Sequence, residues 1–287
     1  MRIHKIIKPK HHSYPPNIGA GNNAGSPINH YNGAVQDMRI YNRDISEPEI
    51  KALYNEGKIR KSGIEKTESN VPGQSEGGVS RYKLNGNIDD SWSDNNGTNN
   101  GADLTATGVY GQAAEFNGTS DYIRIPDLGI QGGGNDSLTV SFWFNGGDSL
   151  GSDERLVNLR ENFEFIANIG RVGTDTIGVR WRTPSGGTEH AFRTISPNTW
   201  YHYTFVYNNA NDTIKGYIDG VLEFNDTGQS GTFNRQNSIG NSAKDDVGYA
   251  EAKIDDVRIY DKALTPVQVE RLYHKGAYRI TRESTLQ

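Results

Sequence analysis

The chain has no cysteine, and only 2 of its 287 residues are methionine. Without cysteine there is neither a disulfide nor a thiolate metal site, so the fold must be stabilised by its own core. The sequence also lacks an apolar run of about 18 residues, the length that a membrane-spanning helix needs. The formal net charge of −5 is small and gives no indication of nucleic-acid binding.

The first twelve residues are basic but have no apolar central region. A secretory signal peptide requires such a region, so this segment is not predicted to be one. His11 and His12 could bind a metal ion, although a solvated basic tail explains them better.

Glycine is abundant, with 34 residues, while hydrophobic residues make up only 33% of the chain. This composition is typical of short strands joined by polar turns. Alternating polar and apolar residues predict strands at Ser80–Lys83, Ala113–Phe116, Tyr122–Ile125, Leu138–Phe144, Arg155–Leu159, Phe163–Ile169, Thr176–Arg182, Trp200–Tyr207, Thr213–Ile218, Val221–Asn225, Asn237–Ile239 and Ala252–Tyr260. Asp219-Gly220 predicts a two-residue hairpin turn. We therefore expect an all-β, two-sheet antiparallel jelly-roll sandwich with a short C-terminal helix.

One segment of the chain occurs twice. Residues 33–57 align without a gap with residues 252–276, at an offset of 219 positions (256 minus 37), and share the pairs Asp37/Asp256, Arg39/Arg258, Ile40/Ile259, Tyr41/Tyr260, Leu53/Leu272, Tyr54/Tyr273 and Gly57/Gly276. A repeat at this distance indicates duplicated domains. Each copy is predicted to form a strand, a tight turn and a two-turn helix. In the second copy, Thr265 and Gln268 make a capping-box pattern and Gly276 is placed to end the helix.

These patterns divide the chain into four parts. Residues 1–57 form an N-terminal arm, 58–78 a linker rich in Lys, Glu, Ser and Gly, 79–277 the jelly-roll domain, and 278–287 a tail. The arm is too short for a core of its own. We expect it to pair with another copy of this chain or with another protein, and disorder is the alternative.

Several short motifs follow one another along residues 79–277, and their order is as informative as their sequences. They are Leu84-Asn85-Gly86-Asn87, Gly111 to Gly118, Asp121 to Pro126, Leu138 to Trp143, Thr199 to His202, Tyr217 to Gly220 and Ile254 to Tyr260. With these motifs the segment resembles the laminin-G-like domains of the concanavalin A-like lectin and glucanase superfamily. The N-terminal arm resembles only the last strands and helix of such a domain. The resemblance implies a jelly-roll sandwich that serves lectin-like modules and some glycoside hydrolases.

Catalysis by the laminarinase-type enzymes of this superfamily uses the strand pattern Glu-x-Asp-x-x-Glu, whose carboxylates act as acid and as nucleophile or base. In this sequence Glu164 has no second carboxylate at that spacing, and Asp153-Glu154 has no third. There is also no Gly-x-Ser-x-Gly nucleophile motif. We therefore expect a protein that is not an enzyme, with glycoside hydrolysis as the less favoured reading.

Calcium binding is a second kind of chemistry that the resemblance implies. Calcium needs six to eight oxygen ligands, often carbonyls plus an Asp. The family's closing strand often supplies that Asp, here Asp256, and the carbonyl groups of Asn117 and Gly118 are candidate partners. The alternative is an ion pair between Asp256 and Arg258 with no metal ion.

Sugar recognition needs aromatic faces and planar polar groups. Trp143 and Trp200 are expected in the core, whereas Trp92 and Trp181 either contact sugar or cap an end of the sandwich. An exposed aromatic in a loop indicates function. The predicted carbohydrate-binding residues are Trp92, Arg180, Trp181, His190 and Tyr249.

The sequence thus favours a non-catalytic carbohydrate-binding or adhesion module that acts outside a cell or on a virus particle. Its predicted partner is a glycan or cell-surface polysaccharide. The rival interpretation is a structural virion protein, such as a phage head-decoration or fibre component. The missing signal peptide and the N-terminal arm favour the rival.

Overall fold

The computed structural model describes residues 21–23, 26–28 and 71–283, apart from 131–136, 149, 152, 161–163, 172, 184–185, 228–236 and 242–246. The chain divides into two compact units, Met1–Thr67 and Glu68–Gln287. In the first unit, β1 (Gly21–Asn23) and β2 (Ser26–Ile28) pair as a short antiparallel hairpin. The repeat copy at 33–57 and the two adjacent histidines lie outside the described residues, as do the predictions made for them.

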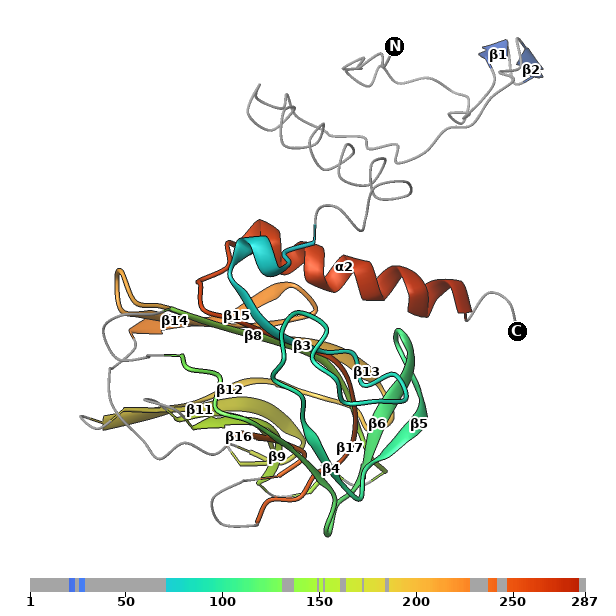
Figure 1. Cartoon of the computed structure of the whole chain (residues 1–287). Helices are drawn as coiled ribbons and strands as arrows, with labels where there is room; N and C mark the ends of the chain where they lie inside the picture. Colours follow the sequence, from blue (N-terminus) through green and yellow to red (C-terminus); the bar gives the residue numbers. More distant parts are fainter. Residues whose placement is uncertain are drawn as a thin grey trace. The chain divides into compact units, whose positions relative to one another are not determined.

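The second unit is a sandwich of two antiparallel sheets, which confirms the predicted fold class (Figure 1). In spatial order, the eight-stranded sheet contains β15 (Val221–Thr227), β14 (Thr213–Ile218), β13 (Trp200–Asn208), β8 (Leu138–Gly146), β17 (Glu251–Tyr260), β6 (Gly111–Asn117) and β5 (Asp103–Gly108), with β3 (Gly78–Tyr82) paired to β17. The seven-stranded sheet contains β12 (Gly186–Thr194), β11 (Thr176–Thr183), β10 (Glu164–Ile169), β9 (Glu154–Arg160), β16 (Asn237–Ile239), β7 (Tyr122–Ile125) and β4 (Thr98–Asn100).

The core lies between the two sheets. Its largest side chains come from alternate positions of the central strands, because every second residue of a strand faces the same side. Phe142 on β8 stacks on Tyr203 of β13 at 4.8 Å, and Phe165 on β10 reaches Phe205 at 5.0 Å between ring centroids. Burial of these rings joins one sheet to the other.

The predicted strands are all present, with small shifts at their ends. Asp219 and Gly220 both have positive φ, at 54° and 75°, as the predicted hairpin turn between β14 and β15 requires. Three strands of this unit were not predicted: β4, β5 and β12. Their sequences are short or rich in Gly, Thr and Asn, so the apolar alternation that identifies a strand is weak there.

The C-terminal helix, α2 (Pro266–Glu283), begins as predicted and is longer than predicted. Thr265 donates its backbone N–H to Gln268 Oε1 at 2.9 Å, and Gln268 N–H donates to Thr265 Oγ1 at 3.4 Å, which completes the capping box. The helix continues through Gly276, so placing the helix end at Gly276, with a tail from 278, was wrong. A Cβ at position 276 would lie 2.3 Å from Trp143 Cζ2, so this glycine permits close packing of α2 on the sheet.

The domain also begins earlier than predicted. The segment from residue 71, assigned to the linker, packs on the eight-stranded sheet and contains the 3-10 helix η1 (Gln74–Glu76). The Tyr260 hydroxyl donates to the Pro72 carbonyl oxygen at 2.9 Å, which fixes this segment to β17. No helix in the described part of the chain is long and apolar enough to cross a membrane.

Candidate functional site

The outer face of the seven-stranded sheet is polar, although most of its side chains are buried. On β9 and β10 the core side chains Val157, Leu159 and Ala167 alternate with outward ones, which are polar except for the buried Ile166. Asn158 and Asn168 therefore face away from the core. In register, Asn158 lies opposite Ser238 of β16, and Asn168 lies opposite Arg155 of β9. Cross-strand neighbours of this kind lie about 5 Å apart, so these side chains form one cluster.

Several polar atoms of this cluster have no hydrogen-bond partner among the described residues. They are Nδ2 and Oδ1 of Asn158, Oδ1 of Asn168, and Nε and Nη1 of Arg155. Asn158 and Asn168 are completely buried, and Arg155 is 6% exposed. The amide of Asn241, which follows β16, is in the same situation. Because an unsatisfied buried polar group costs about 1–3 kcal/mol, such a concentration of them indicates a site that another molecule completes.

A chain of ion pairs borders the cluster. Asp153 Oδ2 lies 3.2 Å from Arg155 Nη2 and 2.8 Å from Arg171 Nη1. Arg171 Nε in turn contacts Glu189 Oε1 at 2.9 Å, and Arg180 Nε lies 3.6 Å from the same oxygen. Burial favours a lower pKa for Arg171, but the hydrogen bonds to Glu189 and Asp153 outweigh it and raise the pKa. The Arg171 guanidinium therefore stays charged, and its ion pairs hold it in place.

Two tyrosines lie at the other side of the same face. Tyr122 and Arg124 of β7 face outward, because Ile123 and Ile125 between and after them are in the core. The ring centroid of Tyr249 is 6.5 Å from that of Tyr122, and Arg124 Cζ lies 5.0 Å from the Tyr122 ring centroid. This edge combines aromatic faces with a cation, next to the polar cluster.

Of the predicted carbohydrate-binding residues, only two lie on this face: Arg180 and Tyr249. Trp181 does not, because it lies on the same face of β11 as the core residues Ile177 and Val179. It is 1% exposed and packs on Phe205 at 5.2 Å between ring centroids. Stacking of a sugar on Trp181 is therefore excluded in this fold.

The other two predicted residues lie elsewhere. Trp92 packs edge-on against Tyr260 at 5.3 Å between ring centroids, on the outer face of the eight-stranded sheet. His190 stacks on Phe224 of β15 at 4.5 Å, and its Nε2 lies 3.2 Å from Asp226 Oδ2. Trp92, Trp181 and His190 thus do not form one site with Arg180 and Tyr249.

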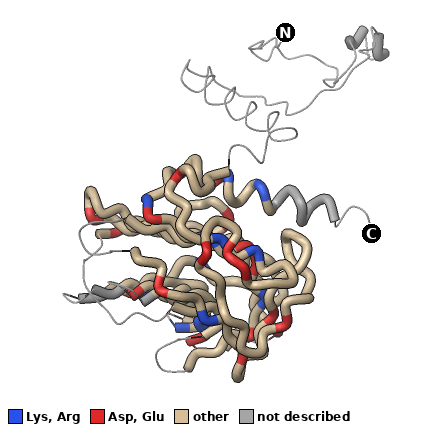
Figure 2. Tube along the Cα trace, in the orientation of Figure 1, with Lys and Arg blue, Asp and Glu red and all other residues tan. Residues whose placement is uncertain are grey.

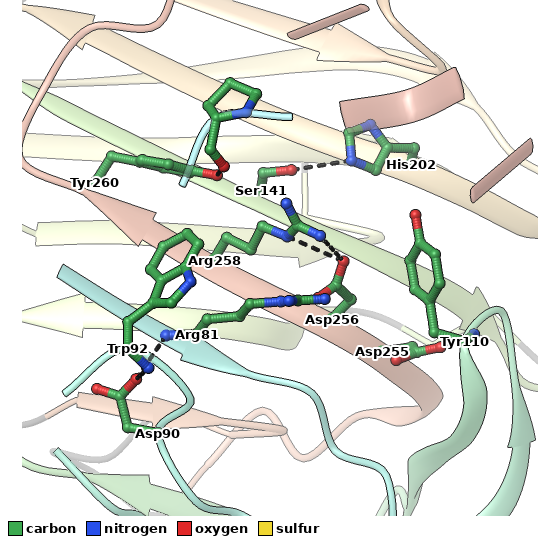
Figure 3. Close-up of polar contacts among 11 residues, drawn as sticks. Arg81, Asp90, Trp92, Tyr110, Ser141, His202, Asp255, Asp256, Arg258 and Tyr260 are labelled. Carbon is green, nitrogen blue, oxygen red and sulfur yellow. Dashed lines mark hydrogen bonds and ion pairs between the residues drawn. The ribbon is translucent and has the colours of Figure 1, made fainter. Parts of the chain in front are cut away.

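A second polar network is buried on the outer face of the eight-stranded sheet (Figure 3). Asp256 accepts hydrogen bonds from Arg81 Nε and Arg258 Nη2, each at 2.7 Å. Burial works to raise the pKa of Asp256, but the guanidinium groups of Arg258 and Arg81 lower it to about 2. As predicted, Val257 faces the core and Asp256 faces away from it, but Asp256 is buried at 4% exposure. Asp256 is therefore a buried anion with two cationic partners.

Ser141 and His202 lie next to this network, with 2.9 Å between Oγ and Nε2. The pair does not have the geometry of a catalytic triad. His202 Nδ1 has no hydrogen-bond partner among the described residues, so no carboxylate orients the ring. Both residues are buried, and burial together with the charge of Arg258 lowers the pKa of His202 to about 3.

The predicted calcium ligands are not adjacent. Asn117 and Gly118 lie beside the start of β17, where Asn117 pairs with Glu251. Asp256 is five residues further along the strand, about 16 Å away at the usual rise. The side-chain oxygen of Asn117 accepts the Thr119 and Ser120 N–H groups of its own turn. The described residues contain no cluster of three or more acidic or histidine side chains placed for a metal ion, and calcium binding itself stays a prediction.

Sequence reasoning missed the polar cluster. Its signal is a single amide within an apolar strand, as in Leu156-Val157-Asn158-Leu159 and Phe165-Ile166-Ala167-Asn168-Ile169. A buried amide in such a run needs a hydrogen-bond partner.

Comparison with solved structures gives several similar folds. Domain 4 of AbnA, a GH43 extracellular arabinanase from Geobacillus stearothermophilus, in complex with arabinotriose, is 25% identical at a TM-score of 0.56, covering 69% of this chain and 98% of that domain. The binding domain of Paraclostridial Mosquitocidal Protein 1 matches at a TM-score of 0.56 with 15% identity over 70% of this chain. The Botulinum neurotoxin serotype D ligand binding domain in complex with N-Acetylneuraminic acid matches at 0.54, with 16% identity over 69% of this chain.

The chain spans about half the length of the two toxin domains, 52% and 51%, and these two likenesses concern the fold alone. No curated protein sequence matches the chain. The sequence model of the concanavalin A-like lectin/glucanases superfamily, however, matches residues 117–270. That match covers more than half of the chain and coincides with the sandwich described above, so the chain belongs to the concanavalin A-like lectin/glucanase superfamily.

Proposed function

We propose that this protein is a non-catalytic carbohydrate-binding module and that the polar outer face of the seven-stranded sheet is its binding site. The observation that carries the proposal is the buried set of donors and acceptors without partners on Asn158, Asn168 and Arg155. It contains donors on Asn158 and Arg155 and acceptors on both amides. A sugar hydroxyl group both donates and accepts, so a polyhydroxylated ligand satisfies both kinds of atom.

The aromatic edge supports the same proposal. Ligand sites combine apolar or aromatic surface with a few polar groups that fix orientation. Tyr122 and Tyr249 offer ring faces beside the amides, and both are half-buried. The arabinanase domain in complex with arabinotriose is a further support, because this chain covers 98% of it at 25% identity.

The carboxylates of this face favour binding over hydrolysis. Glycosidases use two carboxyl groups, one as general acid and one as nucleophile or base. Asp153, Glu164 and Glu189 each form an ion pair with an arginine, at 2.8, 3.6 and 2.9 Å, so these carboxylates are already engaged with cations of the face. The extracellular arabinanase domain also supports a place of action outside a cell.

The proposal is tested by calorimetric titration of the protein with arabinotriose and with a panel of neutral and acidic oligosaccharides. We expect Tyr249→Ala to weaken binding at least tenfold, since truncation of a hot-spot aromatic costs about 2 kcal/mol or more. Leu222→Ala is the matched control, because Leu222 is an exposed side chain on β15 of the other sheet. Equal affinity in both variants would place the site elsewhere, and release of shorter sugars from the ligand would show that the protein is an enzyme.

A further inference from the structure

The basic residues in the strands differ between the two sheets. Strands of the seven-stranded sheet contain Arg124, Arg155, Arg160, Arg180, Arg182 and Arg193, and no lysine. Strands of the eight-stranded sheet contain both types, Arg81 and Arg258 together with Lys215 and Lys253. The restriction to arginine is therefore a property of the seven-stranded sheet.

From it we infer that the ligand of this face carries a carboxylate, that is, an acidic sugar; the inference rests on the proposed carbohydrate-binding function. Arginine presents a planar fork of N–H donors that matches a carboxylate, whereas lysine presents a compact, strongly hydrated charge. A face that uses only arginine is therefore fitted to a planar anion.

The charge balance of the face agrees with an anionic ligand. Arg193 pairs with Glu223 and Asp219 at the β14–β15 hairpin of the other sheet, so it does not count toward this face. With Arg171 from the adjoining loop, four arginines whose side chains are described accompany three ion-paired carboxylates: Arg124, Arg155, Arg171 and Arg180. Figure 2 shows this mixture of basic and acidic positions along the lower sheet.

Arg155 is the residue best placed to receive the anion. Only its Nη2 is engaged, with Asp153, while Nε and Nη1 have no partner among the described residues. Its neighbour across the strand is Asn168, and Asn158 lies on the same strand. A charged donor with unused N–H groups in a buried setting gains most from an anion, because little solvent screens the interaction.

The experiment compares matched ligands that differ only in whether the carboxylate is free or esterified: trigalacturonic acid against its methyl ester, and 3′-sialyllactose against its methyl ester. Affinities are measured by calorimetry at about 50 mM and 500 mM NaCl, since salt screens charge attraction at these concentrations. We expect at least one acid to bind at least tenfold more tightly than its neutral counterpart and to lose that preference in high salt. The two pairs distinguish a uronic acid from a sialic acid as the source of the carboxylate.

The variant Arg155→Ala should lose the preference for the acid, whereas Lys215→Ala on β14 should keep it. Because Arg155 is buried, Arg124→Gln at the half-buried edge is a second test, and the melting temperature of each variant reports its folding. Equal affinity for acid and neutral sugars would overturn the inference and leave the carbohydrate proposal intact. Binding to none of the four ligands, nor to any member of the wider panel, would overturn both.

Discussion

Asp256 and Arg258 form an ion pair within one strand, with only Val257 between them. Their side chains meet because β17 contains a bulge, where the register to β8 shifts between Asp255 and Arg258 and Asp256 has a φ of 51°. The bulge turns Asp256 toward Arg258 and Arg81 while Val257 and Ile259 stay in the core. The ion pair was expected from the sequence as the alternative to a calcium ligand at Asp256, and calcium binding itself stays a prediction.

Removing the Asp256 carboxylate should leave the guanidinium groups of Arg81 and Arg258 without their anionic partner. We expect Asp256→Asn to destabilise the sandwich by about 3–5 kcal/mol, the usual cost of breaking a buried pair from one side. Urea unfolding at pH 7, followed by tryptophan fluorescence, measures this loss. The destabilisation should be the same in calcium and in chelator. A loss confined to calcium-containing buffer would instead identify Asp256 as a calcium ligand.

Burial of His202 makes stability depend on pH. Its pKa is about 3 in the folded protein, lowered by burial and by Arg258, against about 6.5 in the unfolded chain. The contribution of neutral His202 is therefore complete above pH 6.5 and is lost as the pH falls from 6.5 toward 3. We expect the stability of His202→Gln relative to wild type to increase on acidification through this window. If the difference in unfolding free energy between His202→Gln and wild type were constant from pH 7 to pH 4, the lowered pKa of His202 would be contradicted.

Asp255 should make the stability of the fold depend on pH in the direction opposite to that of His202. Burial raises its pKa to about 7, although the Tyr110 N–H donates to its Oδ2 at 2.8 Å. Its neutral form is favoured in the fold, so its contribution is complete below about pH 4 and is lost as the pH rises through 7. We expect Asp255→Asn to gain stability relative to wild type between pH 4 and pH 8, by at most a few kcal/mol at about 1.4 kcal/mol per pKa unit. If chemical unfolding gave the same dependence of stability on pH for Asp255→Asn and wild type, the raised pKa of Asp255 would be refuted.

The contact between α2 and Trp143 should not tolerate a methyl group. Gly276→Ala adds a Cβ at 2.3 Å from Trp143 Cζ2, so the helix must move or the ring must turn. We expect a net loss of about 1–3 kcal/mol from overpacking, despite a helix-propensity gain of about 1 kcal/mol. His274→Ala, at an exposed position of the same helix, is the control. A higher melting temperature for Gly276→Ala would show that α2 does not pack closely on Trp143.

The position of Trp181 could have been predicted from the sequence. Ile177, Val179 and Trp181 are spaced by two, which places all three on the core face of β11, and Arg180 on the other. The two flanking arginines and the following turn pointed instead to an exposed loop. Periodicity was the stronger signal, because it also predicted most of the other strands of both sheets.

The polar cluster could be predicted only in part. An isolated amide such as Asn158 or Asn168 within an apolar strand indicates an unusual outward position. Which strands lie side by side is set by the order of the sheet, and β16 pairs with β9 although they are almost 80 residues apart in sequence. The juxtaposition of Arg155, Asn168 and Tyr249 depends on that order, and a single sequence does not specify it.

The last strand of the chain, β17, is also a central one, between β8 and β6. During translation, β8 and β6 are complete more than 100 residues before the strand that must join them. Until residue 260 has left the ribosome, both strands have an open edge able to pair with other chains. The nascent protein therefore cannot complete its larger sheet in stages. It must close the sheet in one late step, and conditions that slow that step, such as crowding by other nascent chains, favour aggregation over folding.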